Sequence, residues 1–219
     1  MADILVERFE AWSSAIFISD FPDGAEWQQQ LSELICQQAN QQPSPVASNI
    51  APHAKHKVWE SELNFLAQHQ QRLAPLIDFF QAATLNAAYE LNADYWPPEL
   101  EPEVDIVESW YHLTREGGFH DAHSHPNCSW CGIYYVDAGE SSLTAQNGMN
   151  RFYDPRHNAA HYQDVGTHYL NYEGCWDFQP KNGQLVIFPS YLKHAALPYF
   201  GKTPRIVIAF NCCLRARNF

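Results

Sequence analysis

Three histidines have the types and spacing to bind a metal ion. His123 and His125 are separated by one residue, His194 follows 69 residues later, and Arg205 follows 11 residues after that. At the end of a strand, side chains two positions apart lie on the same side of the backbone, so the first two imidazoles would point together. A distant third histidine would complete one face of a metal site and leave other coordination positions open for chemistry. Arg205 is a candidate anchor for a carboxylate.

The composition indicates a folded protein that does not bind polyanions. The chain has 219 residues, of which 46% are hydrophobic and 14% aromatic, and a net charge of −12. That charge repels phosphate backbones and anionic lipid headgroups, so neither nucleic acid nor membrane is expected as a partner. The start of the chain has no signal-peptide pattern, and no apolar run approaches the roughly 20 residues that span a bilayer. We therefore expect a cytoplasmic protein.

The first hundred residues are expected to be mainly helical. Residues 12–21 form an extended apolar segment, and Asp23 begins a helix that continues to about residue 40. Apolar residues recur at intervals of three and four over residues 61–92, which predicts a longer helical region. Pro75 should break or kink it, because proline has no backbone N–H.

From residue 103 the pattern changes to short β-branched and aromatic runs separated by turn residues, including Gly117-Gly118. Such a succession predicts an antiparallel sandwich or barrel. We expect a single domain, 1–219, with helical support from 1–100 and a β core over 103–213. The runs are VDIVESWYHL, SWCGIYYV, NRFYD, THYLNY, QLVIF and RIVIAFNCCL.

Glycine and proline spacings narrow the type of β core. Five residues separate Gly117 from His123, five separate Gly183 from Pro189, and His194 follows Pro189 by five positions. These spacings resemble the two metal-bearing strand pairs of cupin-type double-stranded β-helices. The usual cupin glutamate is missing after the His-x-His, so the resemblance to ordinary cupins is partial.

A larger set of motifs resembles the Fe(II)- and 2-oxoglutarate-dependent oxygenases of bacteria and phages, which are relatives of the prolyl hydroxylases. The resemblance covers about residues 103–213 and implies a mainly β fold with N-terminal helices, whose core is a double-stranded β-helix of the jelly-roll type. The motifs that carry it are Ser109-Trp110-Tyr111, Gly117-Gly118, His123-Ser124-His125-Pro126, residues 132–136, residues 152–156, residues 183–190, His194 and Arg205.

The resemblance also implies roles for individual residues. His123 and His194 match iron ligands, and Arg205 matches the basic residue that binds the C5 carboxylate of 2-oxoglutarate, for which a guanidinium is well suited. A phenol from Tyr134 or Tyr135 could hydrogen-bond the same carboxylate, but strand alternation allows only one of them to face inward. We take Tyr134 as the candidate. The implied reaction hydroxylates a C–H bond and releases succinate and CO2.

One departure from the prolyl hydroxylases concerns the third metal ligand. Those enzymes have Asp or Glu two residues after the first histidine, and this chain has His125 there. The subgroup with His-x-His-Pro shares the departure, so His125 is a candidate ligand. A nearby carboxylate from Asp121 or Asp154 is the alternative.

Several residues near these motifs have a functional and a structural interpretation. Arg156 is a candidate substrate residue, or part of a simple Asp-Pro-Arg turn. Trp110 is a candidate substrate platform, although a core role is the more common one for tryptophan. Cys128-x-x-Cys131 could bind zinc or act in redox chemistry, but a pair of buried free thiols is the simpler interpretation. Arg205 itself could pair with a surface acid.

Two other functions compete with the 2-oxoglutarate oxygenase. One is a three-histidine, cupin-like metal dioxygenase that does not use 2-oxoglutarate, for which Arg205 would be dispensable. The other is a non-catalytic metal-binding module. The substrate, a small molecule or a protein, is not identified by the sequence, and a homodimer is left open. The aromatic insertion over residues 157–178 is a candidate lid or substrate wall.

Overall fold

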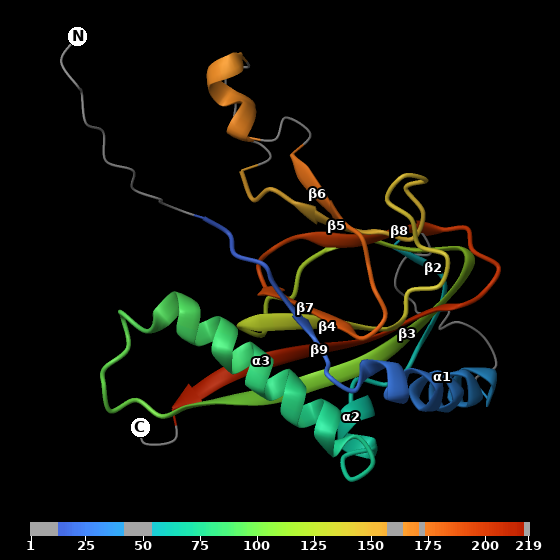
Figure 1. The fold of residues 1–219 in the computed structure, drawn as a ribbon, viewed down its shortest axis with the longest axis horizontal. Helices are drawn as coiled ribbons and strands as arrows, with labels where there is room; N and C mark the ends of the chain where they lie inside the picture. The colour runs from blue at the N-terminus through green and yellow to red at the C-terminus, as the bar shows by residue number, and fades with distance from the viewer. Residues whose placement is uncertain (1–12, 42–53, 157–163, 171–173, 217–219) are drawn as a thin grey trace.

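The computed structural model describes residues 13–41, 54–156, 164–170 and 174–216, and strands dominate it (Figure 1). The helices are α1 (Gly24–Gln41), α2 (Phe65–Gln68), α3 (Ala74–Asn92) and the 3-10 helix η1 (Val165–Leu170). The strands are β1 (Phe17–Asp20), β2 (Lys55–Glu60), β3 (Pro102–His123), β4 (Trp130–Asp137), β5 (Asn150–Tyr153), β6 (Cys175–Phe178), β7 (Gln184–Pro189), β8 (His194–Tyr199) and β9 (Arg205–Ala216).

The strands form one curled antiparallel sheet in the order β1-β7-β4-β9-β3-β8-β5-β6, with β2 also paired to β3. Its two halves face each other. In Figure 1, β4, β7, β9 and the first part of β3 form one layer, β5, β6 and β8 lie across from it, and α1 and α3 cover the outer side of the first layer. The predicted mainly β fold with a jelly-roll core and supporting helices is therefore confirmed.

Strand β3 belongs to both layers because it bends in the middle. Its first part pairs with β9 as far as Thr114, and its last part pairs with β8 from Gly118 onward. Gly117 has φ +78°, and a Cβ on Gly118 would lie 2.8 Å from the carbonyl oxygen of Lys57. The two glycines were expected to separate strands; instead they allow one 22-residue strand to turn from one layer into the other.

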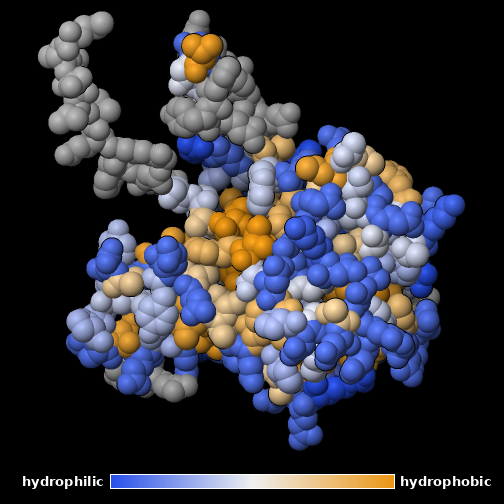
Figure 2. Space-filling view, in the orientation of Figure 1, coloured by the Kyte–Doolittle hydropathy of each residue, from blue (hydrophilic) through white to orange (hydrophobic). Residues whose placement is uncertain are grey.

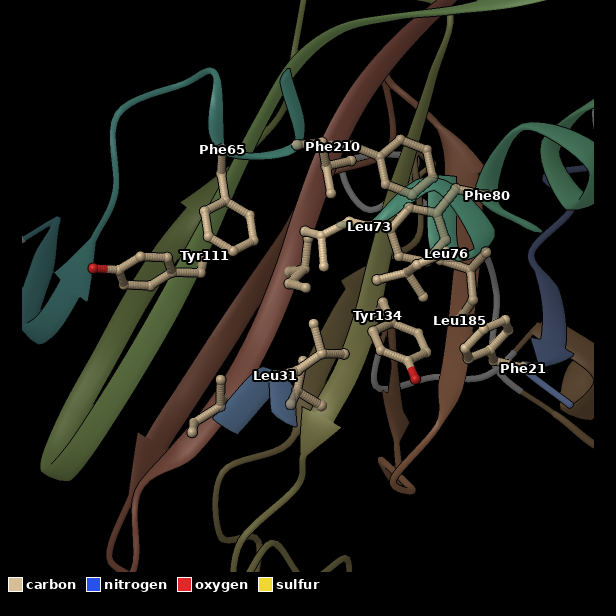
Figure 3. Packing of buried hydrophobic residues seen from close by; sticks show 14 of the residues in the cluster. Phe21, Leu31, Phe65, Leu73, Leu76, Phe80, Tyr111, Tyr134, Leu185 and Phe210 are labelled. Atoms are coloured by element: carbon tan, nitrogen blue, oxygen red, sulfur yellow. The ribbon is translucent and has the colours of Figure 1, made fainter. Parts of the chain in front are cut away.

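Side-chain alternation divides the buried residues into two groups. On the helix-facing side of the first layer, Tyr111, Tyr134 and Phe210 pack against the helices, and the ring of Phe80 stacks on that of Phe210 with centroids 4.9 Å apart (Figure 3). On the other side of the same strands, residues such as Tyr135 pack between the two layers. The surface around the molecule is largely hydrophilic, and apolar side chains gather in a hollow between the helical side and the upper strands (Figure 2).

The predicted helices are confirmed, but three β segments were missed and one was wrongly expected. Helix α1 covers the predicted 23–40 segment. The second predicted region is divided into α2 and α3, and Pro75 lies in the first turn of α3. Strands β2, β6 and β8 were not among the predicted β runs. The run 167–172 was expected to be a strand, but its described part belongs to η1, where the Asp164 carboxylate accepts a hydrogen bond from the Gly166 N–H and starts a helical turn. Among the described residues, we find no helix with the length and hydropathy of a membrane span.

We expect Phe80→Ala to destabilise the protein by about 3–5 kcal/mol, because Phe80 is fully buried and anchors α3 to β9. Urea denaturation followed by circular dichroism measures this loss in the free energy of unfolding. Phe200→Ala is the matched control, since the Phe200 side chain is 63% exposed and should cost less than about 0.5 kcal/mol. Similar losses in both variants would contradict the proposed anchoring.

Candidate metal centre

The three candidate histidines come together in the structure. His123, the last residue of β3, is the direct cross-strand partner of His194, the first residue of β8. The His125 N–H donates to the carbonyl of Ser190 at 3.0 Å, which holds the third imidazole beside the other two. One ligand atom from each histidine lies within 4.8 Å of the others, and within the described ranges no other group of three or more potential metal ligands occurs.

Hydrogen bonds prepare two of the histidines to bind metal through Nε2. The Nδ1 atom of His123 lies 2.8 Å from the carbonyl oxygen of Asp121, and that of His194 lies 3.1 Å from the carbonyl oxygen of Leu192. A carbonyl oxygen only accepts, so each Nδ1 carries the hydrogen and each Nε2 keeps its lone pair. Metal-binding histidines in proteins are usually oriented in this way.

Burial keeps these imidazoles neutral. Together with the neighbouring histidines, it lowers the pKa of His194 to about 3 and that of His125 to about 4. Burial also lowers the pKa of His123. Since only a neutral imidazole can ligate a metal ion, the group is ready to bind one near neutral pH.

The two alternative carboxylates are engaged elsewhere. The carboxylate of Asp121 accepts a hydrogen bond from the N–H of Ala122 at 2.7 Å, and that of Asp154 forms an ion pair with Arg156 at 2.8 Å. Neither belongs to the converging group. Among the described residues, the group is therefore made of imidazoles alone.

Arg205 lies in the same cavity as the histidines, and its charge has no acidic partner in the described chain. The residue is 3% exposed, its Nη2 donates to Oδ1 of Asn150, and its guanidinium lies over the ring of Tyr135 at 5.3 Å from the centroid. Its Nε has no hydrogen-bond partner. The cavity and the open space at its mouth together measure about 450 Å³. A buried cation without a counterion is costly, so this arrangement suits an anionic ligand.

The structure corrects the choice of phenol near Arg205. Tyr134 points away from the cavity into the helix-facing core, where its ring lies 5.3 Å from that of Phe80 (Figure 3). Tyr135 faces the other way, and its hydroxyl donates to Oδ1 of Asn150 at 2.7 Å. The reason is the period-two alternation of β4, which allows only one of two adjacent side chains to face Arg205.

Trp110 and Arg156, the candidate substrate residues, lie in different surroundings. Trp110 lines the cavity, is 6% exposed, and its ring lies 5.8 Å from that of His125. Arg156 is exposed and forms a bidentate pair with Asp154 beyond the end of β5, outside the residues that line the cavity. A role for either in substrate binding remains a prediction, and much of the 157–178 insertion lies outside the described residues.

The Cys128-x-x-Cys131 pair does not contribute to a metal-binding group in the described chain. The two sulfur atoms lie 3.7 Å apart, both as free thiols. The Cys131 side chain is buried, lines the cavity, and its thiol donates to Oδ1 of Asn211 at 3.3 Å. The pair is thus linked to the site through Asn211.

Three residues that join the site were missed by the sequence analysis: Asn150, Asn211 and Glu108. Asn150 accepts hydrogen bonds from both Arg205 and Tyr135, and Asn211 contacts both Glu108 and His125. One signal was available for Asn211, because it follows Arg205 by six positions in a predicted strand, and an even spacing puts both on one face. Asn150 and Glu108 could not be identified in this way, because their place in the site depends on which strands pair.

A jelly-roll with neutral histidines at facing strand ends and a buried, unpaired arginine in the same cavity defines a candidate metal-dependent enzyme of the double-stranded β-helix class. Sequence comparison finds a similarity to one family over just under half of the chain. Residues 108–211 match the model of the family described as "Putative 2OG-Fe(II) oxygenase". This segment contains all the site residues discussed above. No curated protein matches the chain closely enough to count as a relative.

Solved structures of 2-oxoglutarate enzymes share the fold at low sequence identity. A prolyl-4-hydroxylase from Pseudomonas putida has a TM-score of 0.53 and 16% identity, with 91% of this chain and 93% of that one covered. A prolyl hydroxylase from Trichoplax adhaerens, solved with a hypoxia-inducible-factor peptide, has a TM-score of 0.57 and 13% identity, covering 90% and 82%. HygX from Streptomyces hygroscopicus, with nickel, 2-oxoglutarate and hygromycin B bound, has a TM-score of 0.56 and 9% identity, covering 91% and 82%.

The chain is an Fe(II)- and 2-oxoglutarate-dependent oxygenase, with Fe(II) as its cofactor and 2-oxoglutarate as its cosubstrate. The residues present fit both groups. Two imidazoles offer free Nε2 atoms, and the unpaired guanidinium of Arg205 is suited to a carboxylate.

A charged cluster lies beside the histidines, on β2 and β3. The carboxylate of Glu60 contacts both the Lys55 ammonium and Nε2 of His112, and His112 lines the cavity. Burial by itself raises the pKa of Glu60, but the contacts with His112 and Lys55 outweigh it and lower that pKa to about 2. The ionised form of Glu60 therefore stabilises the fold.

We expect Glu60→Gln to lower the free energy of unfolding by about 2 kcal/mol at pH 7. Because the folded-state pKa is depressed, this contribution is present above the unfolded value near 4.5 and is lost as the pH falls toward 2. Urea denaturation of both proteins between pH 7 and pH 3 measures the difference. A difference that stayed constant or grew on acidification would contradict the assignment.

Proposed function

We propose that His123 and His194 hold Fe(II) through their Nε2 atoms, with His125 as the third imidazole of the group. Arg205 holds the far carboxylate of 2-oxoglutarate. The observation that carries the proposal is the buried guanidinium of Arg205, which has no acidic partner in the described chain and shares a cavity with the histidines.

When bound, Fe(II) with 2-oxoglutarate and O2 supplies the oxidation that hydroxylates a C–H bond, with succinate and CO2 as products. The chain supplies position and exclusion of water. Arg205 orients the cosubstrate, and Asn150 and Tyr135 keep its guanidinium in place. Apolar side chains such as Phe188 and Val207 line the rest of the cavity and keep it dry.

The substrate is proposed as a small molecule or a protein side chain that reaches the cavity past Trp110. Similar structures were solved with a peptide in one case and with hygromycin B in another, so we propose that either kind of substrate suits this fold. Arg156 and the 157–178 insertion are proposed to contact the substrate. We propose that residues 1–219 form one oxygenase domain in the cytoplasm, where the six free thiols would persist.

Succinate formation tests the proposed roles. The purified chain with Fe(II), O2 and 2-oxoglutarate should release succinate, and omission of any one of them should abolish it. The anaerobic iron form should develop a charge-transfer absorption band when 2-oxoglutarate is added. If neither succinate nor the band appeared, the three-histidine dioxygenase without 2-oxoglutarate would replace this proposal.

Arg205→Met should raise the KM for 2-oxoglutarate by about tenfold to a hundredfold, because it removes a charged hydrogen-bond donor worth about 1.5–3 kcal/mol. Metal binding should change little. Steady-state kinetics with varied 2-oxoglutarate measures the effect. Arg215→Met is the matched control, since Arg215 is largely exposed and pairs with Asp105 far from the cavity. An unchanged KM in the Arg205 variant would exclude the proposed anchor.

Tyr135→Phe and Tyr134→Phe form a second matched pair. The Tyr135 hydroxyl donates to Asn150, so its loss should loosen the support of Arg205 and raise the KM for 2-oxoglutarate by about fivefold. The Tyr134 hydroxyl is buried without a hydrogen-bond partner, so its removal should leave the KM unchanged. The opposite order of effects would show that the phenols have been assigned to the wrong faces.

A further inference from the structure

Asn211 lies between Glu108 and His125, and nothing in the proposed function uses it. Its Nδ2 donates to Oε2 of Glu108 at 2.7 Å and lies 3.3 Å from Nδ1 of His125. Asn211 is 4% exposed and lines the same cavity as the histidines. Its amide is therefore close enough to control one of the three imidazoles.

The two neighbours of Asn211 determine which way its amide points. The Glu108 carboxylate only accepts hydrogen bonds, so the amide nitrogen faces it. On the other side, the Cys131 thiol donates to the amide oxygen at 3.3 Å. The second hydrogen on Nδ2 is left for His125.

This hydrogen bond uses the only lone pair that a neutral imidazole offers in the ring plane. If Nδ1 of His125 accepts from Asn211, the hydrogen of the ring is on Nε2. Neither nitrogen then has a lone pair for a metal ion. His123 and His194 show the opposite arrangement, because their Nδ1 atoms donate to backbone carbonyls and their Nε2 atoms stay free.

We propose that Glu108 and Asn211 are positioning residues that keep His125 from ligating the metal, so that His123 and His194 are its only histidine ligands. This inference rests on the proposed function. His125 would then be a hydrogen-bond donor beside the metal, and the coordination position that a carboxylate fills in prolyl hydroxylases would be left to an anionic ligand such as the cosubstrate or a small anion.

The first test is ¹⁵N NMR of the full chain labelled at histidine, without metal and then with Zn(II), with His125→Gln used to assign the signals. In the metal-free chain we expect the ring hydrogen on Nε2 in His125 and on Nδ1 in His123 and His194. On addition of Zn(II), two histidines should take metal-bound shifts while His125 keeps its N–H. A metal-bound shift for His125 would overturn the inference.

The second test uses Asn211→Leu, which removes the amide without changing the charge of residue 211. The freed His125 should become a third ligand, so Zn(II) should bind about tenfold more tightly by calorimetry, and the metal-bound ¹⁵N signals should rise to three. A merely structural role predicts the reverse, since loss of a supporting partner typically weakens metal binding 10–100-fold. Weaker or unchanged affinity with two bound histidines would therefore refute the proposal.

Gln184→Leu is the matched control. Gln184 is 6% exposed, and its amide donates to the Asp20 carboxylate at 3.0 Å, so this variant also leaves one carboxylate without its amide partner. The pair joins β7 to β1 and lies outside the cavity, so Zn(II) affinity should not change.

The ¹⁵N spectrum of the native chain decides the question if Asn211→Leu does not fold. Failure of the proposed function is a separate outcome. It would appear as an absence of succinate, whereas the hydrogen position on His125 is measured in the metal-free protein. Nδ1–H on His125 in that spectrum would overturn the inference even in an active enzyme.

Discussion

The alternation of side chains along the paired strands β3, β4 and β9 is the constraint on which both the stability and the site depend. Each of these strands has one face toward the helices and one toward the opposite layer of the sheet. A shift of one residue in the pairing would exchange the two faces. Tyr134 and Tyr135 illustrate this, since one packs on Phe80 and the other supports Arg205. The apolar packing of the helices therefore also keeps the polar side chains of the site in register.

The site depends on burial as much as on position. The same apolar surroundings that stabilise the fold lower the pKa values of His123, His125 and His194 and keep them neutral. They also leave Arg205 as a cation with no acid beside it in the described chain. Both features cost stability in the empty protein. The neutral histidines and the buried cation become favourable once a metal cation and a dicarboxylate are bound. Such residues serve ligand binding at the expense of stability.

Hydrogen bonds to the imidazoles make the three histidines chemically unequal. Backbone carbonyls take the Nδ1 hydrogens of His123 and His194, and such partners are set by the strand and turn geometry itself. His125 faces a side-chain amide whose own orientation depends on Glu108 and Cys131. The hydrogen bonding of His125 therefore depends on residues from three strands, β3, β4 and β9. Substitution of a residue far from His125 in the sequence can change it. Proximity alone does not decide which imidazoles bind a metal ion.

The class of fold, the helices around Pro75 and a set of candidate site residues could be predicted from the sequence: His123, His125, His194 and Arg205. These signals are local, because periodicity, turn residues and motif spacing are properties of short stretches of chain. The facing of Tyr134 and Tyr135, the bend of β3 at Gly117 and Gly118, and the contacts of Asn150 and Asn211 could not be predicted. They depend on which strands pair and in what register, and this pairing joins residues far apart in the chain. These features follow from the packing of the folded chain, because packing and not sequence neighbourhood fixes the hydrogen-bond partners.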